Sequence, residues 1–176
     1  MTAGSADTAK SPCTTVIVQH TGANFSDSLI RLLGTATKAK VTAATQNAIL
    51  QTGHIYVATG DSHHVRLIEG VPPRIRLDQA MRISGHRPSV DALFHSATGF
   101  AQHVTAAILT GMGRDGADGL AALRAAGART IGQDAATSVV YGMPRVAKSL
   151  GGVETELPIQ KIGPALVQLA MQRKRR

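Results

Sequence analysis

Two residues suited to acid–base chemistry stand at the ends of short apolar runs. His20 closes "TTVIVQH" (14–20), and Asp115 lies in the glycine-rich stretch "TGMGRDGADGL" (110–120) that follows a second apolar run. In an open parallel sheet, the carboxyl ends of the strands share one edge, where catalytic groups collect. An aspartate beside a histidine can accept its Nδ1–H, fix its tautomer and stabilise the imidazolium. We therefore predict that the two strands are neighbours and that His20 and Asp115 meet as a general base and its orienting carboxylate.

Each residue also has a simpler interpretation. Asp115 immediately precedes a predicted helix, where an aspartate often only caps free N–H groups. His20 by itself is typical of a hydrogen-bonded histidine at a strand end. Neither residue carries a functional argument without the other.

The glycines around Asp115 allow two further interpretations. Gly111 to Gly116 has the G-x-G-x-x-G spacing of a dinucleotide loop, and Asp134 follows the next strand where a ribose-binding acid would stand. Against this, a carboxylate beside the third glycine repels a phosphate. The favoured interpretation is that Gly111 and Gly113 bend the backbone so that an N–H such as that of Met112 faces inward as an oxyanion donor.

The pattern along the chain predicts one α/β domain, doubly wound, with a mostly parallel sheet and an antiparallel hairpin excursion. Ser26 is expected to cap the first helix and Gly34 to end it. The expected organisation is a poorly defined N-terminal segment at 1–13, the domain at 14–170 and a basic tail at 171–176. Strands are predicted within 14–20, 40–45, 54–59, 103–111 and 128–133, a hairpin within 63–77, and helices within 26–36, 87–100, 117–127, 142–152 and 158–174.

Composition narrows the function classes. The single cysteine, Cys13, excludes an intrachain disulfide, and the chain has neither a signal peptide nor an apolar run long enough for a bilayer, so a cytoplasmic protein without membrane insertion is expected. The net charge of +8 favours acidic protein partners, whereas the scarcity of aromatic residues argues against nucleic acid. The histidines lack metal-ligand spacing, so neither a metal nor a cofactor is expected.

Four ordered stretches carry a family resemblance: "VIVQH" (16–20), "HRPSVDALFHS" (86–96), "ILTGMGRDGADGL" (108–120) and "VVYGMPR" (139–145). From about Thr14 to near Leu166 the chain resembles the catalytic domain of the chemotaxis protein-glutamate methylesterases, the CheB family. The resemblance implies hydrolysis of glutamyl methyl esters on the methylated cytoplasmic region of chemoreceptors, often with deamidation of selected glutamines, by a Ser-His-Asp triad. By position, it assigns the triad histidine to His20, the aspartate to Asp115 and a backbone oxyanion donor to Met112.

The nucleophile is where the chain departs from this family. The family carries its serine in a "GASTGG"-like turn before a helix that leads into the histidine strand. Here the nearest match is Ser5 in "AGSADT", and the residues between it and Thr14 are too few for a parallel crossover. Three explanations stay open: the start is truncated or misplaced; the protein binds receptors without hydrolysing them; or an irregular N-terminal segment offers Ser5 or, with less support, Ser11 or Cys13.

The leading hypothesis is therefore a carboxyl-ester hydrolase impaired by the missing nucleophile segment, with no receiver domain in this chain. The first alternative is a non-catalytic receptor- or protein-binding module on the same fold. The second is a nucleotide-binding α/β domain that uses Gly111 to Gly116.

Overall fold

The strands form two parallel sheets and one antiparallel pair in the computed structural model, which describes residues 13–173. The first sheet has the order β1-β3-β2 and the second the order β6-β7-β8, while β4 and β5 pair antiparallel. The prediction of a mostly parallel α/β fold with an antiparallel hairpin is confirmed. The strands are β1 (Thr15–Val18), β2 (Lys40–Ala43), β3 (His54–Ala58), β4 (His64–Ile68), β5 (Arg74–Asp78), β6 (Thr105–Ile108), β7 (Arg129–Gln133) and β8 (Thr155–Leu157).

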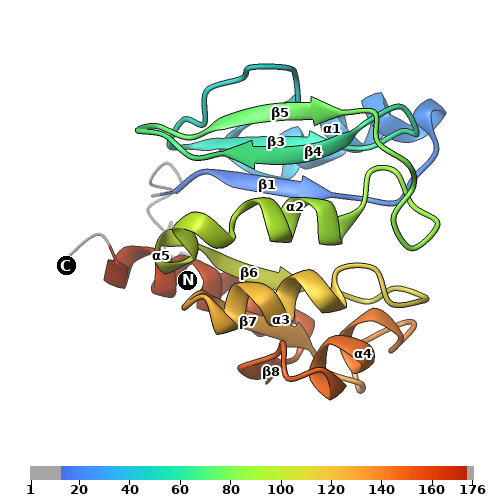
Figure 1. The fold of residues 1–176 in the computed structure, drawn as a ribbon, viewed down its shortest axis with the longest axis vertical. Coiled ribbons are helices and arrows are strands. Elements are labelled where there is room, and N and C mark those ends of the chain that lie inside the picture. Colours follow the sequence, from blue (N-terminus) through green and yellow to red (C-terminus); the bar gives the residue numbers. More distant parts are fainter. Residues whose placement is uncertain (1–12, 174–176) are drawn as a thin grey trace, which may run out of the picture.

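Helices cover both faces of the second sheet. Figure 1 shows α3 and α4 in front of β7 and α5 behind it, whereas α1 packs against β2 of the first sheet. α2 contacts β4 on one side and α3 on the other, so it joins the two halves of the domain. The helices are α1 (Ser26–Ala36), α2 (Val90–Ser96), α3 (Ala117–Ala125), α4 (Met143–Ser149) and α5 (Ile159–Arg173), with short 3-10 turns at Ala23–Phe25 and Thr98–His103.

The hydrophobic core runs through α2. Leu93 and Phe94 of this helix are buried together with Leu120 and Leu123 of α3, and Val65 of β4 belongs to the same cluster. Burial of a large aliphatic or aromatic side chain contributes about 1.5–3 kcal/mol. α2 is therefore held in place by apolar packing on two sides. The loop that leads into its N-terminus is attached to this fixed helix.

Two predictions about local structure are wrong, and one strand is missing from the prediction. Phe25, not Ser26, occupies the N-cap position of α1, because the Ser26 hydroxyl accepts a hydrogen bond from Thr59 Oγ1 at 2.7 Å. Gly34 does not end that helix, which continues to Ala36. β8 is absent from the predicted strands, since a three-residue strand gives too short a pattern to recognise.

The strands that lead to His20 and Asp115 are not hydrogen-bonded neighbours. Within residues 13–173, β1 pairs only with β3 and β6 pairs only with β7. Figure 1 shows β1 and β6 pointing the same way, with α2 between them in this view, so their carboxyl ends still lie at one side of the domain. The expected common edge exists, although strand pairing does not create it.

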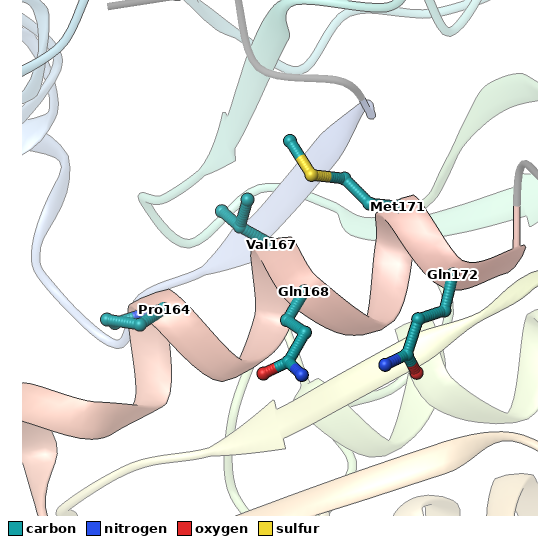
Figure 2. Close-up of a pocket in the computed structure, with 5 residues that line it drawn as sticks. All are labelled: Pro164, Val167, Gln168, Met171 and Gln172. Atoms are coloured by element: carbon teal, nitrogen blue, oxygen red, sulfur yellow. The ribbon is translucent and has the colours of Figure 1, made fainter. Parts of the chain in front are cut away.

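A surface pocket of ≈ 680 Å³ lies along α5. In Figure 2, Val167 and Met171 point to one side of the helix and Gln168 and Gln172 to the other. With Pro164, these residues form the lining, so the pocket contains neither His20 nor Asp115. No helix in the part of the chain that the structure describes is long and apolar enough to cross a membrane.

The close contact of α2 and α3 makes Gly119 a sensitive position. A Cβ on Gly119 would lie 2.8 Å from Phe94 Cβ and 3.2 Å from Asp91 Cα, so we expect Gly119→Ala to destabilise the protein by about 1–3 kcal/mol. The matched change Gly163→Ala in α5 meets nothing within 4 Å and should stabilise by up to about 1 kcal/mol through helix propensity. Urea unfolding of both variants measures the difference, and equal effects would contradict it.

Candidate active site

His20 and Asp115 lie in direct contact. The Nε2 atom of His20 is 2.8 Å from Asp115 Oδ2, although the two residues are 95 positions apart in the chain. The Asp115 side chain is fully buried, whereas that of His20 is 21% exposed. The arrangement is a buried carboxylate that orients a partly accessible imidazole, with Nε2 toward the carboxylate rather than the Nδ1 anticipated from the sequence. The ring's other nitrogen, Nδ1, is then the one available for proton transfer.

Asp115 also caps a helix, but not the one that it precedes. Its carboxylate accepts hydrogen bonds from the backbone N–H of Val90 (2.8 Å) and Asp91 (3.2 Å) and from Ser89 Oγ (2.6 Å). These groups form the N-terminus of α2, where the free N–H groups and the helix dipole favour an anion. The capping interpretation and the orienting interpretation are therefore both compatible with the same carboxylate.

Asp91, at the start of α2, in turn caps the N-terminus of α3. The Oδ1 atom of this buried residue in the first turn of α2 accepts a hydrogen bond from Gly119 N in α3 at 2.7 Å. Asp115 precedes α3 and binds α2, while Asp91 begins α2 and binds α3. The two helix N-termini thus exchange carboxylate caps, which fixes the Asp115 loop against α2.

The pKa values of the two buried carboxyl groups are shifted in opposite directions. Burial raises the pKa of Asp115, but hydrogen bonds from His20, Ser89 and the backbone of Val90 and Asp91 outweigh it, and the pKa falls below its usual value. Burial raises the pKa of Asp91, and its backbone hydrogen bonds offset only part of that rise. Asp115 is therefore the carboxylate that stays ionised beside His20 at neutral pH.

The glycines of the 111–116 loop serve this arrangement. Gly113 and Gly116 have φ values of 92° and 87°, which side chains other than glycine rarely adopt. A Cβ on Gly116 would also approach Val90 Cγ1 to 2.5 Å. In a dinucleotide loop, the phosphate would bind the first amides of α3, but Asp91 already binds the N–H of Gly119. This geometry argues against the nucleotide-binding alternative.

Met112 lies at the tip of the same loop. Its side chain is 81% exposed, and within residues 13–173 its backbone N–H has no hydrogen-bond partner. The loop is held from behind, because Gly111 N donates to Val140 O at 3.0 Å and Met143 N donates to Gly111 O at 2.8 Å. The Met112 N–H therefore lies on a fixed backbone three residues before the buried Asp115 and stays a candidate oxyanion donor.

His86 has no role predicted from the sequence, yet it contacts His20. The two imidazole rings are stacked, with centroids 3.8 Å apart and planes inclined by 7°. Burial and the neighbouring His20 lower the pKa of His86. Ser89 is likewise expected from the sequence only to begin a helix. The stretch "HRPSVD" is the one signal for both, because it joins two polar residues to a helix start.

The nucleophile candidates do not join this network in the described residues. Ser5 and Ser11 lie outside residues 13–173. Cys13 precedes β1 whereas His20 follows it, so the two are separated by roughly 20 Å along an extended strand. The buried Ser89 hydroxyl donates to Asp115 and accepts from Ala92 N, which leaves it committed to the helix cap.

One buried polar atom beside His20 lacks a partner. Thr21 Oγ1 makes no hydrogen bond within residues 13–173, although buried hydroxyls are nearly always satisfied. This atom follows the catalytic candidate directly in the chain. In the same part of the chain, no group of three His, Cys, Asp or Glu side chains is arranged to hold a metal ion.

Comparison with known proteins agrees with this geometry. A sequence model of the CheB methylesterase family matches residues 5–166. A protein-glutamate methylesterase/protein-glutamine glutaminase of Gluconobacter oxydans is 48% identical over 163 residues, covering 90% of this chain and 46% of the relative. One from Caulobacter vibrioides is 45% identical over 161 residues, covering 91% and 47%.

The fold comparison gives the same result. The crystal structure of the Thermotoga maritima CheB methylesterase catalytic domain matches with a TM-score of 0.85 and 30% identity, covering 91% of this chain and 85% of that domain. The chain therefore belongs to the CheB methylesterase family, as the resemblance predicted. It spans about half the length of the curated relatives it matches.

The charge of Asp115 should be visible in the pH dependence of stability. Because its pKa is lowered on folding, its ionisation stabilises the protein fully above the unfolded pKa of about 3.9, and this contribution is lost as the pH falls through the folded pKa. We expect Asp115→Asn to cost about 3 kcal/mol at neutral pH and less below about pH 3. Asp118→Asn, which removes an exposed ion pair with Arg114, should cost under about 1 kcal/mol. Urea unfolding at both pH values tests this, and a cost independent of pH would contradict it.

Proposed function

We propose that this chain carries the general base of a protein-glutamate methylesterase, with His20 as the base and Asp115 as its orienting carboxylate. The observation that carries the proposal is the 2.8 Å contact between them, anchored by the N-terminus of α2. The family of the chain supports the same reaction class. The substrates would be glutamyl methyl esters, and also selected glutamines, on the cytoplasmic helical region of chemoreceptors.

The proposed reaction proceeds in two steps. A nucleophilic hydroxyl attacks the γ-carbonyl carbon of the ester while His20 Nδ1 takes its proton, and the Met112 N–H binds the developing oxyanion. Collapse of the tetrahedral intermediate expels methanol, which receives the proton from His20. Water then attacks the acyl-enzyme, again through His20, to release the glutamate carboxylate and restore the hydroxyl. Asp115 stays ionised throughout and stabilises the imidazolium.

We place the nucleophilic hydroxyl outside the described residues, because Ser89 is committed to the helix cap and Cys13 lies at the other end of β1. Ser5 is the candidate within this sequence and lies in the part that matches the family. No cofactor is required by this chemistry, and a reducing cytoplasm suits a protein with a single cysteine.

A second candidate function is receptor binding without hydrolysis. It is favoured by the position of Ser89, the hydroxyl that joins the network, because its Oγ is buried in the cap of α2 and cannot reach a substrate. In this alternative, the family surface would hold a receptor segment while the chain lacked a nucleophile of its own.

Methanol release separates the two functions. With a methylated receptor cytoplasmic fragment as substrate, we expect the wild-type chain to release methanol and His20→Ala to lower the rate by roughly 10⁴-fold or more. The exposed His103 provides a matched control, and His103→Ala should keep the wild-type rate.

The nucleophile is tested in the same assay. Ser5→Ala should abolish release if Ser5 is the nucleophile, and should leave it unchanged if another hydroxyl acts. If the wild-type chain releases methanol no faster than His20→Ala, the hydrolase proposal is refuted and receptor binding without hydrolysis is supported.

A further inference from the structure

A groove of ≈ 530 Å³ includes the oxyanion candidate Met112 in its lining, although it contains neither His20 nor Asp115. It starts at the oxyanion candidate Met112 and continues over Val140 and Tyr141 to Arg145 in α4. Arg114, which also lines it, directly precedes Asp115 in the chain, so the groove and the candidate site share one loop. The complete lining is Met112, Gly113, Arg114, Val140, Tyr141, Gly142, Arg145 and Val146.

The groove is a rigid feature. Its two loops are joined by hydrogen bonds from Gly111 N to Val140 O (3.0 Å) and from Val140 N to Thr110 Oγ1 (2.8 Å). A Cβ on Gly142 would lie 2.5 Å from Gly111 O, so glycine permits this close approach of the loops. A partner therefore meets a preformed surface and does not have to order it, which lowers the entropic cost of binding.

The chemistry of the lining is apolar and cationic. Met112 and Val140 are 81% and 44% exposed, and Val139, beside the groove, is 91% exposed. The lining includes two arginines and no carboxylate. Arg145 is exposed and forms no ion pair within residues 13–173, while Arg114 holds only an exposed pair with Asp118, of the weak kind that a partner carboxylate can replace.

We infer that this groove docks an acidic amphipathic helix, with apolar side chains on Met112 and Val140 and carboxylates on Arg114 and Arg145. The inference rests on the proposed function, because the groove shares Met112 with the proposed oxyanion site and a glutamate-bearing helix is the proposed substrate. Glu156, the nearby carboxylate, is engaged by Tyr141 and Lys148 and so does not cancel the arginines. The groove would thus select glutamates that lie within an acidic helical context.

Binding can be measured without hydrolysis. The probe is a fluorescent receptor cytoplasmic helix with glutamine at the methylation positions, titrated with His20→Ala protein so that no turnover occurs. On this background, Arg145→Glu should weaken binding roughly tenfold, and the weakening should shrink as salt is raised from about 0.05 to about 0.5 M. Lys161→Glu is the matched control, since Lys161 is exposed on α5 behind the second sheet.

A second variant distinguishes binding in the groove from non-specific attraction to the positively charged protein. Val140→Ser should weaken binding at every salt concentration, because the substitution removes an apolar interaction that salt does not screen. Equal weakening by Arg145→Glu and Lys161→Glu, or none by Arg145→Glu, overturns the inference. Absence of methanol release with intact, Arg145-dependent binding would refute the hydrolase but not the groove.

A second inference rests on the stacked imidazoles. The loop that carries His86 is extensively fixed: Arg87 donates to Asp61 O at 3.1 Å, and Ile83 and His86 exchange two backbone hydrogen bonds. The buried His64 also binds this loop, through Ser89 N (3.2 Å) and Met81 O (3.0 Å). Such a network holds the His86 ring flat on that of His20.

We propose that His86 is a positioning residue, whose ring fixes the plane of His20 so that Nε2 faces Asp115. The charged groups around it are His20, Asp115 and Arg82. Burial lowers the pKa of His86, so it stays neutral when His20 takes a proton, and two adjacent cations are avoided. The ring's contribution is therefore its shape and face, which a phenyl ring can reproduce.

NMR spectra of the His20 ring protons test this role in the whole chain. In the wild type, the stacked ring should shift these protons upfield. His86→Phe should retain both that shift and the downfield signal of the His20 Nε2–H bound to Asp115, whereas His86→Ala should abolish the first and weaken the second. His86→Ala spectra like those of the wild type, or a phenylalanine variant as perturbed as the alanine variant, would overturn it.

Discussion

The carboxylate of Asp115 at the N-terminus of α2 is the interaction on which the site depends. One oxygen of the carboxylate contacts His20. The two oxygens together accept hydrogen bonds from the Ser89 hydroxyl and from two backbone N–H groups of α2. Asp91 completes the exchange by binding Gly119 in α3. Because β1 and β6 are not paired in the described residues, the His20–Asp115 contact, and not a sheet ladder, joins the segments that follow the two strands. A site formed this way is as rigid as the α2–α3 packing beneath it.

Two buried carboxylates close together repel each other when both are ionised. Here the two groups accept different sets of hydrogen bonds, so their pKa values differ. Asp115 receives donors from a histidine, a hydroxyl and two amides, so its pKa falls despite burial. Asp91 has backbone donors only, and its pKa rises. When neighbouring titratable groups are driven apart in this way, their roles differ. In the proposed reaction, Asp115 would supply the negative charge beside a protonated His20, while Asp91 binds Gly119 and so attaches α2 to α3.

The sequence is sufficient to predict the order of helices and most strands, because apolar periodicity and glycine positions are local signals. It also indicates that His20 and Asp115 share an edge, but the predicted cause, neighbouring strands, is wrong. What local patterns cannot encode is which distant amide a carboxylate will bind: Asp115 caps α2 rather than the helix it precedes. The role of His86 escapes prediction for the same reason, since its contact with His20 depends on a loop fixed by Arg87 and His64.

The ambiguous glycine motif shows why spacing alone does not define a phosphate site. Gly111, Gly113 and Gly116 match a dinucleotide loop because both kinds of loop need positive φ angles and close backbone approach. The difference lies in whether the following helix keeps its first amides free. Here Asp91 reaches across from α2 and takes the amide of Gly119, so the anion at this helix terminus is the protein's own side chain. The same bend then serves to bury Asp115 behind His20 and to leave Met112 at the mouth of the groove.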